Sequence, residues 1–338
     1  MPNLDWKNLP FSYLKTNYNL RCYFRNGKWG EIMKEKSETI ELHIAATCLH
    51  YGQEIFEGMK AVQGRDGKIR IFRWEEHFKR MNSSAREIIM PELPKEIFRK
   101  MIFEVVRLNK EFVPPYESGA FLYIRPLLIG ITPQLAIHPS SDYLFLIFVT
   151  PVGPYCKEGF KPLDFFLEQE RDRAAPSGTG HVKAGGNYAT SLQSIKKAAE
   201  AHCQLVLFLD PKEKKYIDEC SAANFFAIKN NTYITPDSKS ILPSITNRSL
   251  MTLAKDMGMK IERRKIELKE LESFEEVGAC GTAVVIAPAK RIIDSKNNRI
   301  YEYSPDGKPG PISTKLYNRL RAIQCGDEPD KFGWTTII

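Results

Sequence analysis

The sequence lacks the cysteine patterns of disulfide-rich and zinc-binding proteins. Its cysteines are odd in number, and no two of them form a CxxC pair. The seven are Cys22, Cys48, Cys156, Cys203, Cys220, Cys280 and Cys325. Secreted disulfide frameworks use an even set of cysteines, and structural zinc sites use closely paired ligands. We therefore expect free thiols, no metal site and a reducing compartment, the cytoplasm.

Long hydrophobic runs are also absent. The longest one, residues 143–149 (YLFLIFV), is much shorter than the roughly 18 residues that a membrane-spanning helix needs. Residues 1–20 contain no basic stretch followed by an apolar one, so we expect no secretory signal. The run at 143–149 has the length of a buried strand, and we expect no membrane partner.

Basic residues are in excess, but they form no block. The chain has 49 Lys and Arg against 41 Asp and Glu, a net charge of +8. Its densest basic clusters, residues 212–215 (KEKK) and 262–265 (ERRK), contain acidic residues. Nucleic-acid-binding proteins gather their basic residues on one face. We therefore expect no nucleic-acid partner, and only the net charge suggests the alternative of a basic binding module.

The length of 338 residues fits two domains, at about 100 to 200 residues per domain. In the first, residues 1–155, hydrophobic periodicity and proline positions predict both strands and helices. The strands are expected at 69–72, 120–124 and 143–149, and the helices at 74–88 and 95–112. Two helices beside a set of strands indicate a small α/β domain of the α+β type.

Residues 150–162 (TPVGPYCKEGFKP) hold three prolines and two glycines without hydrophobic periodicity, which is typical of a domain linker. A second and larger domain would occupy residues 156–338. Its strands are expected at 163–169, 205–209 and 224–228, and its helices at 188–201, 246–257 and 313–324. A glycine-rich loop spans 171–186, and its first part, about 171–180, would lie between the domains.

The most informative segment is residues 178–191 (GTGHVKAGGNYATS). Glycines on both sides of Lys183 allow tight turns and a close approach to a ligand. Lys183 is either an exposed loop lysine or a nucleophile for Schiff-base chemistry, which needs an amine held in a defined environment. The pattern around Lys183 leaves both interpretations open.

A lysine that binds pyridoxal phosphate needs an acid for the pyridine nitrogen, a hydroxyl for the ring oxygen and an anion site for the phosphate. Glu219, in IDECSAANFF, and Tyr188, five residues after Lys183, are candidates for the first two. Residues 243–246 (PSIT) begin a predicted helix, whose unpaired N–H groups favour an anion, and Arg80 supplies charge. Each residue also has an ordinary structural interpretation, but together their chemistry is complementary.

Seven motifs, in this order, make the sequence recognisable. They are LHYGQEIFEGMKA (49–61), HFKRMNSSA (77–85), FLYIRPLLIG (121–130), GTGHVKAGGNYATS (178–191), DECSAANFF (218–226), LPSITNRSL (242–250) and GACGTAVV (278–285). The chain resembles the branched-chain amino acid aminotransferases, which are class IV aminotransferases of pyridoxal-phosphate fold type IV. The resemblance implies a small N-terminal α/β domain and a larger cofactor-binding C-terminal domain with a β-barrel-like core.

The resemblance also implies roles for the candidate residues. Lys183 would form the internal aldimine with pyridoxal 5′-phosphate and move a proton between the substrate Cα and the cofactor C4′. Glu219 would keep the pyridine nitrogen protonated, and Tyr188 would bind the ring oxygen. The residues that would bind the phosphate are Arg80, Ile245, Thr246 and Thr282.

By the same resemblance, the reaction is the reversible transamination of L-leucine, L-isoleucine and L-valine with 2-oxoglutarate, which yields branched-chain 2-oxo acids and L-glutamate. The substrate pocket would be shared across a homodimer, or across a higher oligomer of dimers. The residues near the substrate would be Tyr51, Phe56, Tyr123, Arg125, Thr282 and Ala283. Aromatic walls suit the apolar side chains, and a guanidinium suits the second carboxylate of glutamate.

Two departures from relatives stand out. Residues 281–288 (GTAVVIAP) lack the cysteines that form a CxxC redox switch in mammalian members, so we predict no such switch. Cys220, Ser221 and Ala222 follow Glu219 where some relatives have Gly-Thr, which alters the hydrogen bonding available there. The alternative enzymes are a D-amino acid aminotransferase or an aminodeoxychorismate lyase, which lack the combination of HYGQEIFEGMKA (50–61) and YIRP (123–126).

Overall fold

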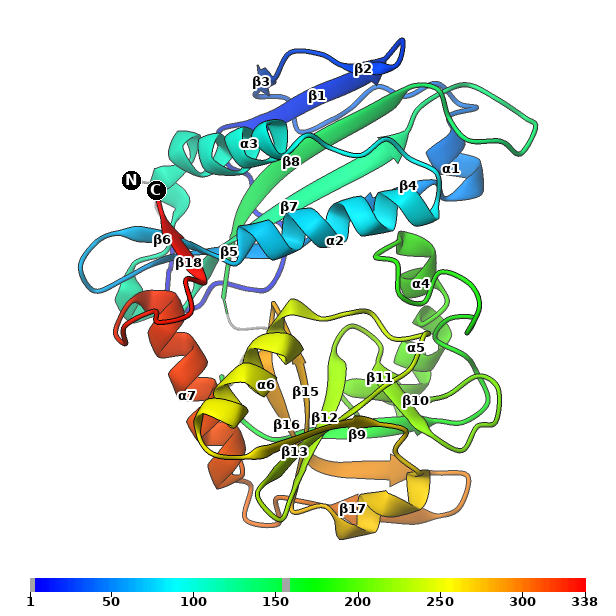
Figure 1. The fold of residues 1–338 in the computed structure, drawn as a ribbon, viewed down its shortest axis with the longest axis vertical. Helices are drawn as coiled ribbons and strands as arrows, with labels where there is room; N and C mark the ends of the chain where they lie inside the picture. The colour runs from blue at the N-terminus through cyan, green and yellow to red at the C-terminus, as the bar shows by residue number, and fades with distance from the viewer. Residues whose placement is uncertain (1–3, 154–158) are drawn as a thin grey trace. The chain divides into compact units, whose positions relative to one another are not determined.

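A computed structural model describes residues 4–153 and 159–338, which group into two compact units (Figure 1). The first unit takes its residues from Met1–Lys157, Val182–Gly185 and Ala322–Ile338, and the second from Glu158–His181 and Gly186–Arg321. Residues 154–158, in the predicted linker, lie outside the described residues, and the predicted domain boundaries stay predictions.

The first unit is built on one antiparallel sheet. Over residues 4–153 and 159–338 its strand order is β18-β6-β5-β7-β8-β1-β2, with β3 beside β1 and β4 beside β7. The strands are β1 (Asn19–Arg25), β2 (Lys28–Trp29), β3 (Met33–Glu35), β4 (Glu54–Phe56), β5 (Met59–Gln63), β6 (Ile69–Phe72), β7 (Phe121–Gly130), β8 (Tyr143–Val152) and β18 (Thr335–Ile337). β7 and β8 pair along their whole length, so the two predicted strands in this region are confirmed and extended.

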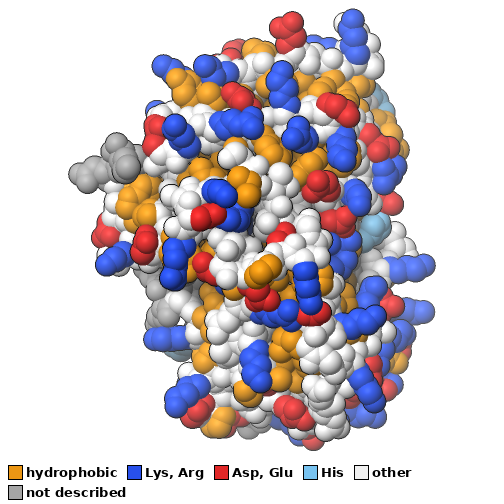
Figure 2. All heavy atoms as spheres, turned by 60° about the vertical axis from the view of Figure 1, so that its left-hand side comes forward, with side chains coloured by type: hydrophobic (Ala, Val, Ile, Leu, Met, Phe, Trp, Pro, Cys, Tyr) orange, Lys and Arg blue, Asp and Glu red, His pale blue; other side chains and the backbone are white. Residues whose placement is uncertain are grey.

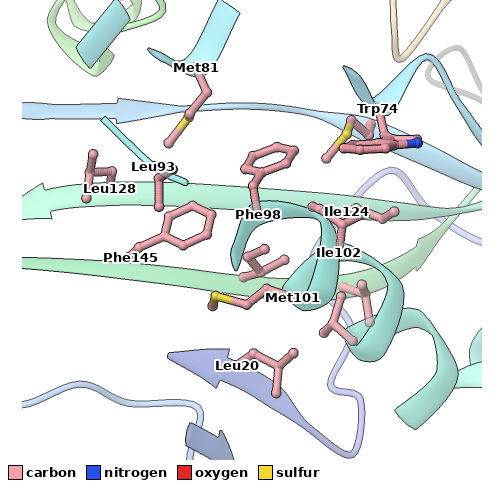
Figure 3. Close-up of a cluster of buried hydrophobic side chains, with 14 of the residues drawn as sticks. Leu20, Trp74, Met81, Leu93, Phe98, Met101, Ile102, Ile124, Leu128 and Phe145 are labelled. Carbon is pink, nitrogen blue, oxygen red and sulfur yellow. The ribbon is translucent and has the colours of Figure 1, made fainter. Parts of the chain in front are cut away.

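Helices α2 (Trp74–Glu87) and α3 (Lys95–Leu108) lie on one face of this sheet (Figure 1). Phe98 of α3 stacks on Phe145 of β8 with their ring centroids 6.0 Å apart, inside a cluster that Met101 and Ile102 extend (Figure 3). The apolar spacing of three and four residues along α3 therefore faces the sheet. Helix α1 (Thr47–Tyr51) and the 3-10 turns η1 (Lys110–Phe112) and η2 (Tyr116–Ser118) complete the helical segments described in this unit.

The helix predicted over 95–112 ends earlier, at Leu108. The Asn109 carboxamide accepts hydrogen bonds from the N–H groups of Asn17 and Tyr18 and donates to the carbonyl of Val105. Asn109 thus joins the helix end to a segment far away in the sequence. This long-range contact competes with continued helix, which local patterns cannot reveal.

The second unit contains a barrel. Its strand order is β11-β10-β9-β16-β15-β12-β13-β14, with β17 beside β16, and a further pairing of β11 with β12 closes six strands into a ring. The strands are β9 (Leu163–Glu168), β10 (Leu205–Leu209), β11 (Ile217–Cys220), β12 (Asn224–Lys229), β13 (Thr232–Pro236), β14 (Lys260–Arg264), β15 (Glu276–Gly281), β16 (Val285–Asp294) and β17 (Arg299–Glu302). The predicted fold class, with its barrel-like core, is confirmed.

Five further helical segments lie within the described residues. They are α4 (Gly185–Ala189), α5 (Leu192–Glu200), α6 (Ile245–Asp256), η3 (Leu268–Ser273) and α7 (Pro311–Cys325). The single helix predicted over 188–201 is instead divided between α4 and α5. Thr190 lies at the break, and its hydroxyl donates to the carbonyls of Arg173 and Asn187. A hydroxyl that binds nearby backbone groups favours helix ends over helix interiors.

Basic and acidic side chains are interspersed on the face drawn in Figure 2, so the excess positive charge is not gathered there into one patch. Over the part of the chain that the structure describes, no helix is both long enough and apolar enough to cross a membrane. Six of the seven cysteines are free, and Cys156 lies outside the described residues.

Candidate active site

The segment around Lys183 packs with the first unit. The backbone carbonyl of Lys183 accepts a hydrogen bond from the N–H of Phe56 at 3.0 Å, and its N–H donates to Ser84 Oγ at 3.2 Å. Its neighbours Val182 and Ala184 are buried among the apolar side chains of this unit. The Lys183 backbone is therefore fixed on both sides, while its side chain is partly exposed.

Glu54 adds a further contact to this segment. Its carboxylate accepts a hydrogen bond from the N–H of Gly185, the first residue of α4. A Cβ atom at Gly185 would lie only 1.9 Å from that carboxylate oxygen, so the close approach requires glycine. Burial raises the pKa of Glu54, while the Gly185 N–H and the charge of Arg125 oppose that rise.

Phe56 lies beside two cations. Lys183 Nζ is 4.5 Å from the centroid of the Phe56 ring, and Arg125 Cζ is 4.8 Å from the same centroid. Tyr123, two residues before Arg125 on β7, faces the same side of the sheet, and its ring centroid is 5.2 Å from Arg125 Cζ. The first unit thus brings together the amine, two aromatic rings and a guanidinium.

Arg125 and Tyr51 differ in their surroundings. The Nε atom of Arg125 is buried and has no hydrogen-bond partner among the described residues, which suits an incoming carboxylate. Tyr51 lies at the end of α1, where its hydroxyl donates to the carbonyl of Leu135 and 38% of the residue is exposed. Tyr51 is therefore at the surface of the first unit.

Arg80, on α2, is bound by Glu57. Arg80 Nε lies 2.6 Å from Glu57 Oε1, and Arg80 Nη2 lies 2.8 Å from Glu57 Oε2. His77, one turn earlier on α2, places Nδ1 2.7 Å from Glu57 Oε2. Sequence reasoning missed Glu57 and His77, although His77 precedes Arg80 by three residues and therefore shares its helix face.

Glu57, His77 and Arg80 change one another's pKa values. Burial raises the pKa of Glu57, but Arg80 and His77 outweigh burial and hold that pKa well below its ordinary value. Burial lowers the pKa of His77, although Glu57 opposes the change. Glu57 is thus an anion, and His77 is neutral near pH 7.

In the second unit, Glu219 is the central buried acid. Its Oε1 atom accepts from Arg173 at 2.8 Å and from the N–H of Leu242 at 2.9 Å, and Oε2 accepts from Asn224 Nδ2 at 2.5 Å. Burial raises the pKa of Glu219 to about 7, with Arg173 opposing and the neighbouring Asp218 adding to the rise. A carboxyl group near neutrality can share a proton with a nitrogen base.

Arg173 was not anticipated from the sequence. Besides Glu219, its guanidinium donates to the carbonyls of Gly180 and Ser240, so it holds the glycine-rich loop in place. Residues 170–173 (ERDR) alternate acidic and basic side chains, which is typical of a solvated turn. Only the tertiary contact with the buried acid therefore distinguishes Arg173 from its charged neighbours.

The start of α6 lies close to Glu219. Ser244 is the N-cap, and its hydroxyl accepts from the N–H of Asn247 at 3.1 Å. Ile245 and Thr246 occupy the first turn of this helix, where backbone N–H groups have no partner within the helix. Asn224 joins the two places, because Nδ2 also donates to the Leu242 carbonyl at 3.1 Å. The segment that leads into α6 therefore lies beside Glu219.

Thr282 and Ala283 lie in the turn between β15 and β16, where Gly281 pairs with Val285. Val285 has a φ of +61°, which is rare for a β-branched residue and indicates backbone strain beside the turn. A Cβ at Gly281 would lie 3.6 Å from the Ala222 carbonyl oxygen, so this turn adjoins the segment after Glu219.

The segment after Glu219 is ordered by its backbone. The N–H of Cys220 donates to the Ala223 carbonyl at 2.8 Å, and the N–H of Ser221 donates to Val206 at 3.0 Å. Tyr188 lies on α4, five residues after Lys183. Of the candidate residues of the second unit, Glu219 lies in the β11–β12 pairing, and the Leu242 N–H, three residues before Ile245, donates to it.

A primary amine beside aromatic rings in the first unit, and a buried acid with an anion-binding helix start in the second, are the groups that an amino-group transfer enzyme needs. The chain belongs to the class IV aminotransferase family, whose model matches residues 54–292. Among its relatives, the branched-chain-amino-acid aminotransferase of Helicobacter pylori is 44% identical over 99% of this chain and 98% of its own length. The enzyme of the same name from Haemophilus influenzae is 42% identical over 100% of both chains.

Solved structures agree. The branched-chain amino acid aminotransferase of Escherichia coli superposes with a TM-score of 0.79 at 26% identity and covers 95% of this chain and 99% of that one. The T.th. enzyme of the same name, solved with pyridoxamine 5′-phosphate, has a TM-score of 0.78 at 25% identity, with coverage of 96% and 99%. The resemblance seen in the sequence motifs is confirmed.

The cofactor of this enzyme is pyridoxal phosphate, and the residues present fit it. Lys183 supplies a primary amine beside an aromatic ring. Glu219 supplies a buried carboxyl group whose pKa of about 7 suits a pyridine nitrogen. The first turn of α6 supplies backbone donors for a phosphate.

Proposed function

We propose that this protein catalyses the reversible transamination of L-leucine, L-isoleucine and L-valine with 2-oxoglutarate, with pyridoxal phosphate held by Lys183. The observation that supports this function best is the position of Phe56 beside both Lys183 Nζ and Arg125. An apolar ring next to the amine suits a branched side chain, and a guanidinium next to the same ring suits the second carboxylate of glutamate. The full-length relatives with this activity in their names support the same substrates.

In this proposal Lys183 would hold pyridoxal phosphate, and its Nζ would be the base that accepts the proton released at the substrate Cα and the acid that donates it again. When bound, pyridoxal phosphate supplies an electron sink for the charge that develops at Cα. Phe56, Tyr123 and Tyr51 contact the substrate side chain, and Arg125 binds the second carboxylate of glutamate or 2-oxoglutarate. The backbone fixed by Phe56 and Ser84 orients the Lys183 amine for proton transfer.

The second unit, together with Arg80 of the first, would supply the remaining contacts. Glu219 holds a proton with the pyridine nitrogen, and Tyr188 donates to the ring oxygen. The turn residues Thr282 and Ala283 bind the α-carboxylate through their backbone. The phosphate ligands are Arg80, the N–H groups of Ile245 and Thr246, and the Thr282 hydroxyl. The buried position of Glu219 and the N-terminal position of Ile245 and Thr246 on α6 support these assignments.

The test of the function is a substrate profile of the amino-donor half-reaction. The purified protein should be yellow, and L-leucine, L-isoleucine, L-valine and L-glutamate should each convert its visible band, whereas D-alanine and aminodeoxychorismate should not. Conversion by D-alanine but not by L-leucine would contradict the proposed substrates.

A lysine variant tests the site itself. Lys183→Ala should abolish transamination, and borohydride reduction followed by peptide mapping should locate the cofactor on Lys183 in the unchanged protein. Lys95→Ala is a matched control, because Lys95 also lies near an aromatic ring of the first unit, with Nζ 5.6 Å from the centroid of Trp74. Full activity of the Lys183 variant would show that the lysine is misassigned.

We also propose that the protein is a homodimer, with or without further association of dimers. The segment that leads into α1 and the loop before β8 carry exposed apolar residues, with Ile44 84%, Leu135 83% and Ile137 86% exposed. Hydrogen bonds between Thr47 and Thr132, and between Gln134 and Ala45, hold the two segments together as one surface. Large apolar residues gathered on one surface are typical of an interface with another protein chain.

Light scattering tests the dimer. Ile137→Asp should shift the protein from dimer to monomer, whereas Ile300→Asp, at a residue 57% exposed in the second unit, should leave the mass unchanged. A monomeric unchanged protein would contradict the proposal.

The compartment is proposed to be the cytoplasm, which the free state of the six described cysteines supports.

A further inference from the structure

Glu57 is a buried carboxylate surrounded by donors. Besides Arg80 and His77, the N–H of Gly58 lies 3.2 Å from Glu57 Oε2. Glu57 is 0% exposed, His77 2% and Arg80 8%. These residues come from the end of β4 and from one face of α2. We call Glu57, His77 and Arg80 the Glu57 cluster.

The geometry of the Glu57 cluster fixes the plane of one guanidinium. Glu57 occupies the edge of Arg80 formed by Nε and Nη2, in the two-point arrangement that suits a carboxylate. An oxyanion that binds Arg80 would therefore contact N–H groups other than the two that Glu57 accepts. Arginine has a long and flexible side chain, so a guanidinium that is fixed beforehand loses less conformational entropy when a ligand binds.

His77 fixes the carboxylate in its turn. A carboxylate can only accept a hydrogen bond, so the 2.7 Å distance assigns the ring proton to Nδ1. With Glu57 negative, Arg80 positive and His77 neutral, the Glu57 cluster has no net charge. Arg80 therefore acts on an anion through the direction of its N–H groups more than through net charge, which makes its contribution depend on its orientation.

We propose that Glu57 and His77 are positioning residues for the phosphate group of the cofactor, with Glu57 orienting Arg80 and His77 orienting Glu57. This inference rests on the proposed function, which assigns Arg80 to the phosphate. Neither residue touches the cofactor in this proposal. Their loss should weaken the recognition of the phosphate and leave the recognition of the pyridine ring unchanged.

The experiment compares two probes on the full-length chain depleted of cofactor. Pyridoxal phosphate and pyridoxal, which lacks the phosphate, are titrated against each variant, and binding is followed by the visible absorption band. The ratio of the two dissociation constants measures the phosphate preference. His77→Leu removes the Nδ1 donor without changing charge and should lower this preference about tenfold, the scale of one hydrogen bond to a charged group. Glu57→Gln should lower it at least as much.

His77→Asn is the matched control, because an asparagine side chain can place an N–H near the position of Nδ1. It should keep the phosphate preference within about threefold of the unchanged protein. Asp66→Asn breaks another two-point contact between a carboxylate and an arginine of the first unit, that of Asp66 with Arg70, and should leave the preference unchanged.

A role confined to folding would weaken both probes equally, and that result would overturn the inference. So would an increased phosphate preference in Glu57→Gln, which would show that Glu57 acts mainly as an opposing charge. Arg80→Met separates the inference from the function on which it rests. If that variant keeps its phosphate preference, the assignment of Arg80 fails; if it loses the preference while Glu57→Gln and His77→Leu keep it, only the positioning role fails.

Discussion

Glu57 of the first unit and Glu219 of the second are both buried, and both contact an arginine at less than 3 Å, yet their pKa values shift in opposite directions. Glu57 receives two N–H groups from Arg80 and a third from His77. Glu219 receives one from Arg173, and its other donors, Leu242 and Asn224, are neutral.

The comparison shows that a nearby arginine does not by itself determine the charge of a buried acid. Burial costs both carboxylates their hydration, and Glu57 offsets this cost with two N–H groups of one guanidinium and the ring N–H of His77, whereas Glu219 has a single contact to Arg173. Asp218, next to Glu219, adds a second acid that opposes ionisation. One glutamate is thus a permanent anion that orients a side chain, and the other can exchange a proton near neutral pH.

The largest expected effect distinguishes the two acids by activity. Glu219→Gln should lower the rate of L-leucine transamination by about 10² to 10⁴, because the amide cannot share a proton with the pyridine nitrogen. Glu57→Gln should recover most of its rate as pyridoxal phosphate is raised to saturation. The measurement is the rate at increasing cofactor concentration. The comparison would fail if the rate of Glu219→Gln recovered at high cofactor concentration, or if the rate of Glu57→Gln did not.

The next effect concerns the stability of the first unit. Glu57→Gln leaves Arg80 buried without its anion and should lower the free energy of unfolding at pH 7 by about 3 to 5 kcal/mol. The lowered pKa of Glu57 adds stability above its unfolded-state pKa, and this stability is lost as the pH falls toward the folded-state pKa. Urea unfolding of the two proteins at pH 7 measures the difference, and equal stability would contradict the charged state of Glu57.

Glu219 should have the opposite effect in the cofactor-depleted chain. Its pKa is about 7 when folded and 4.5 ordinarily, so the folded chain binds the proton more tightly. Its contribution to stability is then greatest below pH 4.5 and falls as the pH rises to about 7. Glu219→Gln lacks this titration, so between about pH 5 and about pH 8 its stability relative to the unchanged protein should rise by about 3 kcal/mol. Urea unfolding of both proteins at about pH 5 and about pH 8 checks this, and a stability difference that is the same at the two pH values would contradict the raised pKa of Glu219.

The smallest expected effect is that of mild oxidation on transamination, through the two cysteines near Glu219. Cys220 and Cys280 lie in the barrel on either side of the β12 start, both are buried, and burial raises the pKa of each thiol. The thiolate is the reactive form, so these thiols should resist mild peroxide. Transamination should change less than about twofold. A loss that a thiol reagent reverses would contradict the absence of a redox switch.

Much of the site could be predicted from local sequence. Glycines around Lys183 predict a close approach to a ligand, which stays a prediction, and the structure shows that Gly185 leaves no room for a side chain beside Glu54. The helix predicted over 246–257 is present within one residue at each end, as α6 (Ile245–Asp256), and Ser244 is its N-cap. These features depend on the backbone geometry of a few consecutive residues, which a short segment specifies by itself.

The missed residues depend on contacts between distant segments. Glu57 and Arg80 are 23 residues apart, and Arg173 and Glu219 are further apart still. Protein surfaces contain many glutamates and arginines. Neither the residue types nor their separation in the sequence therefore distinguishes these two pairs. The division of the predicted helix at 188–201 has the same origin, because it depends on the contact of Thr190 with Arg173.

The sequence by itself determined the family and a helix start near Ile245, because each is encoded in a short motif, and it predicts Lys183 and Glu219 as the amine and the acid of the site. The tertiary structure alone decided that the Lys183 segment packs with the first unit, that β11 and β12 close the barrel, and that two buried glutamates differ in charge. The charge of a buried carboxyl group depends on the number of donors within hydrogen-bonding distance and on how much hydration the group has lost. Both are fixed only when distant segments fold together.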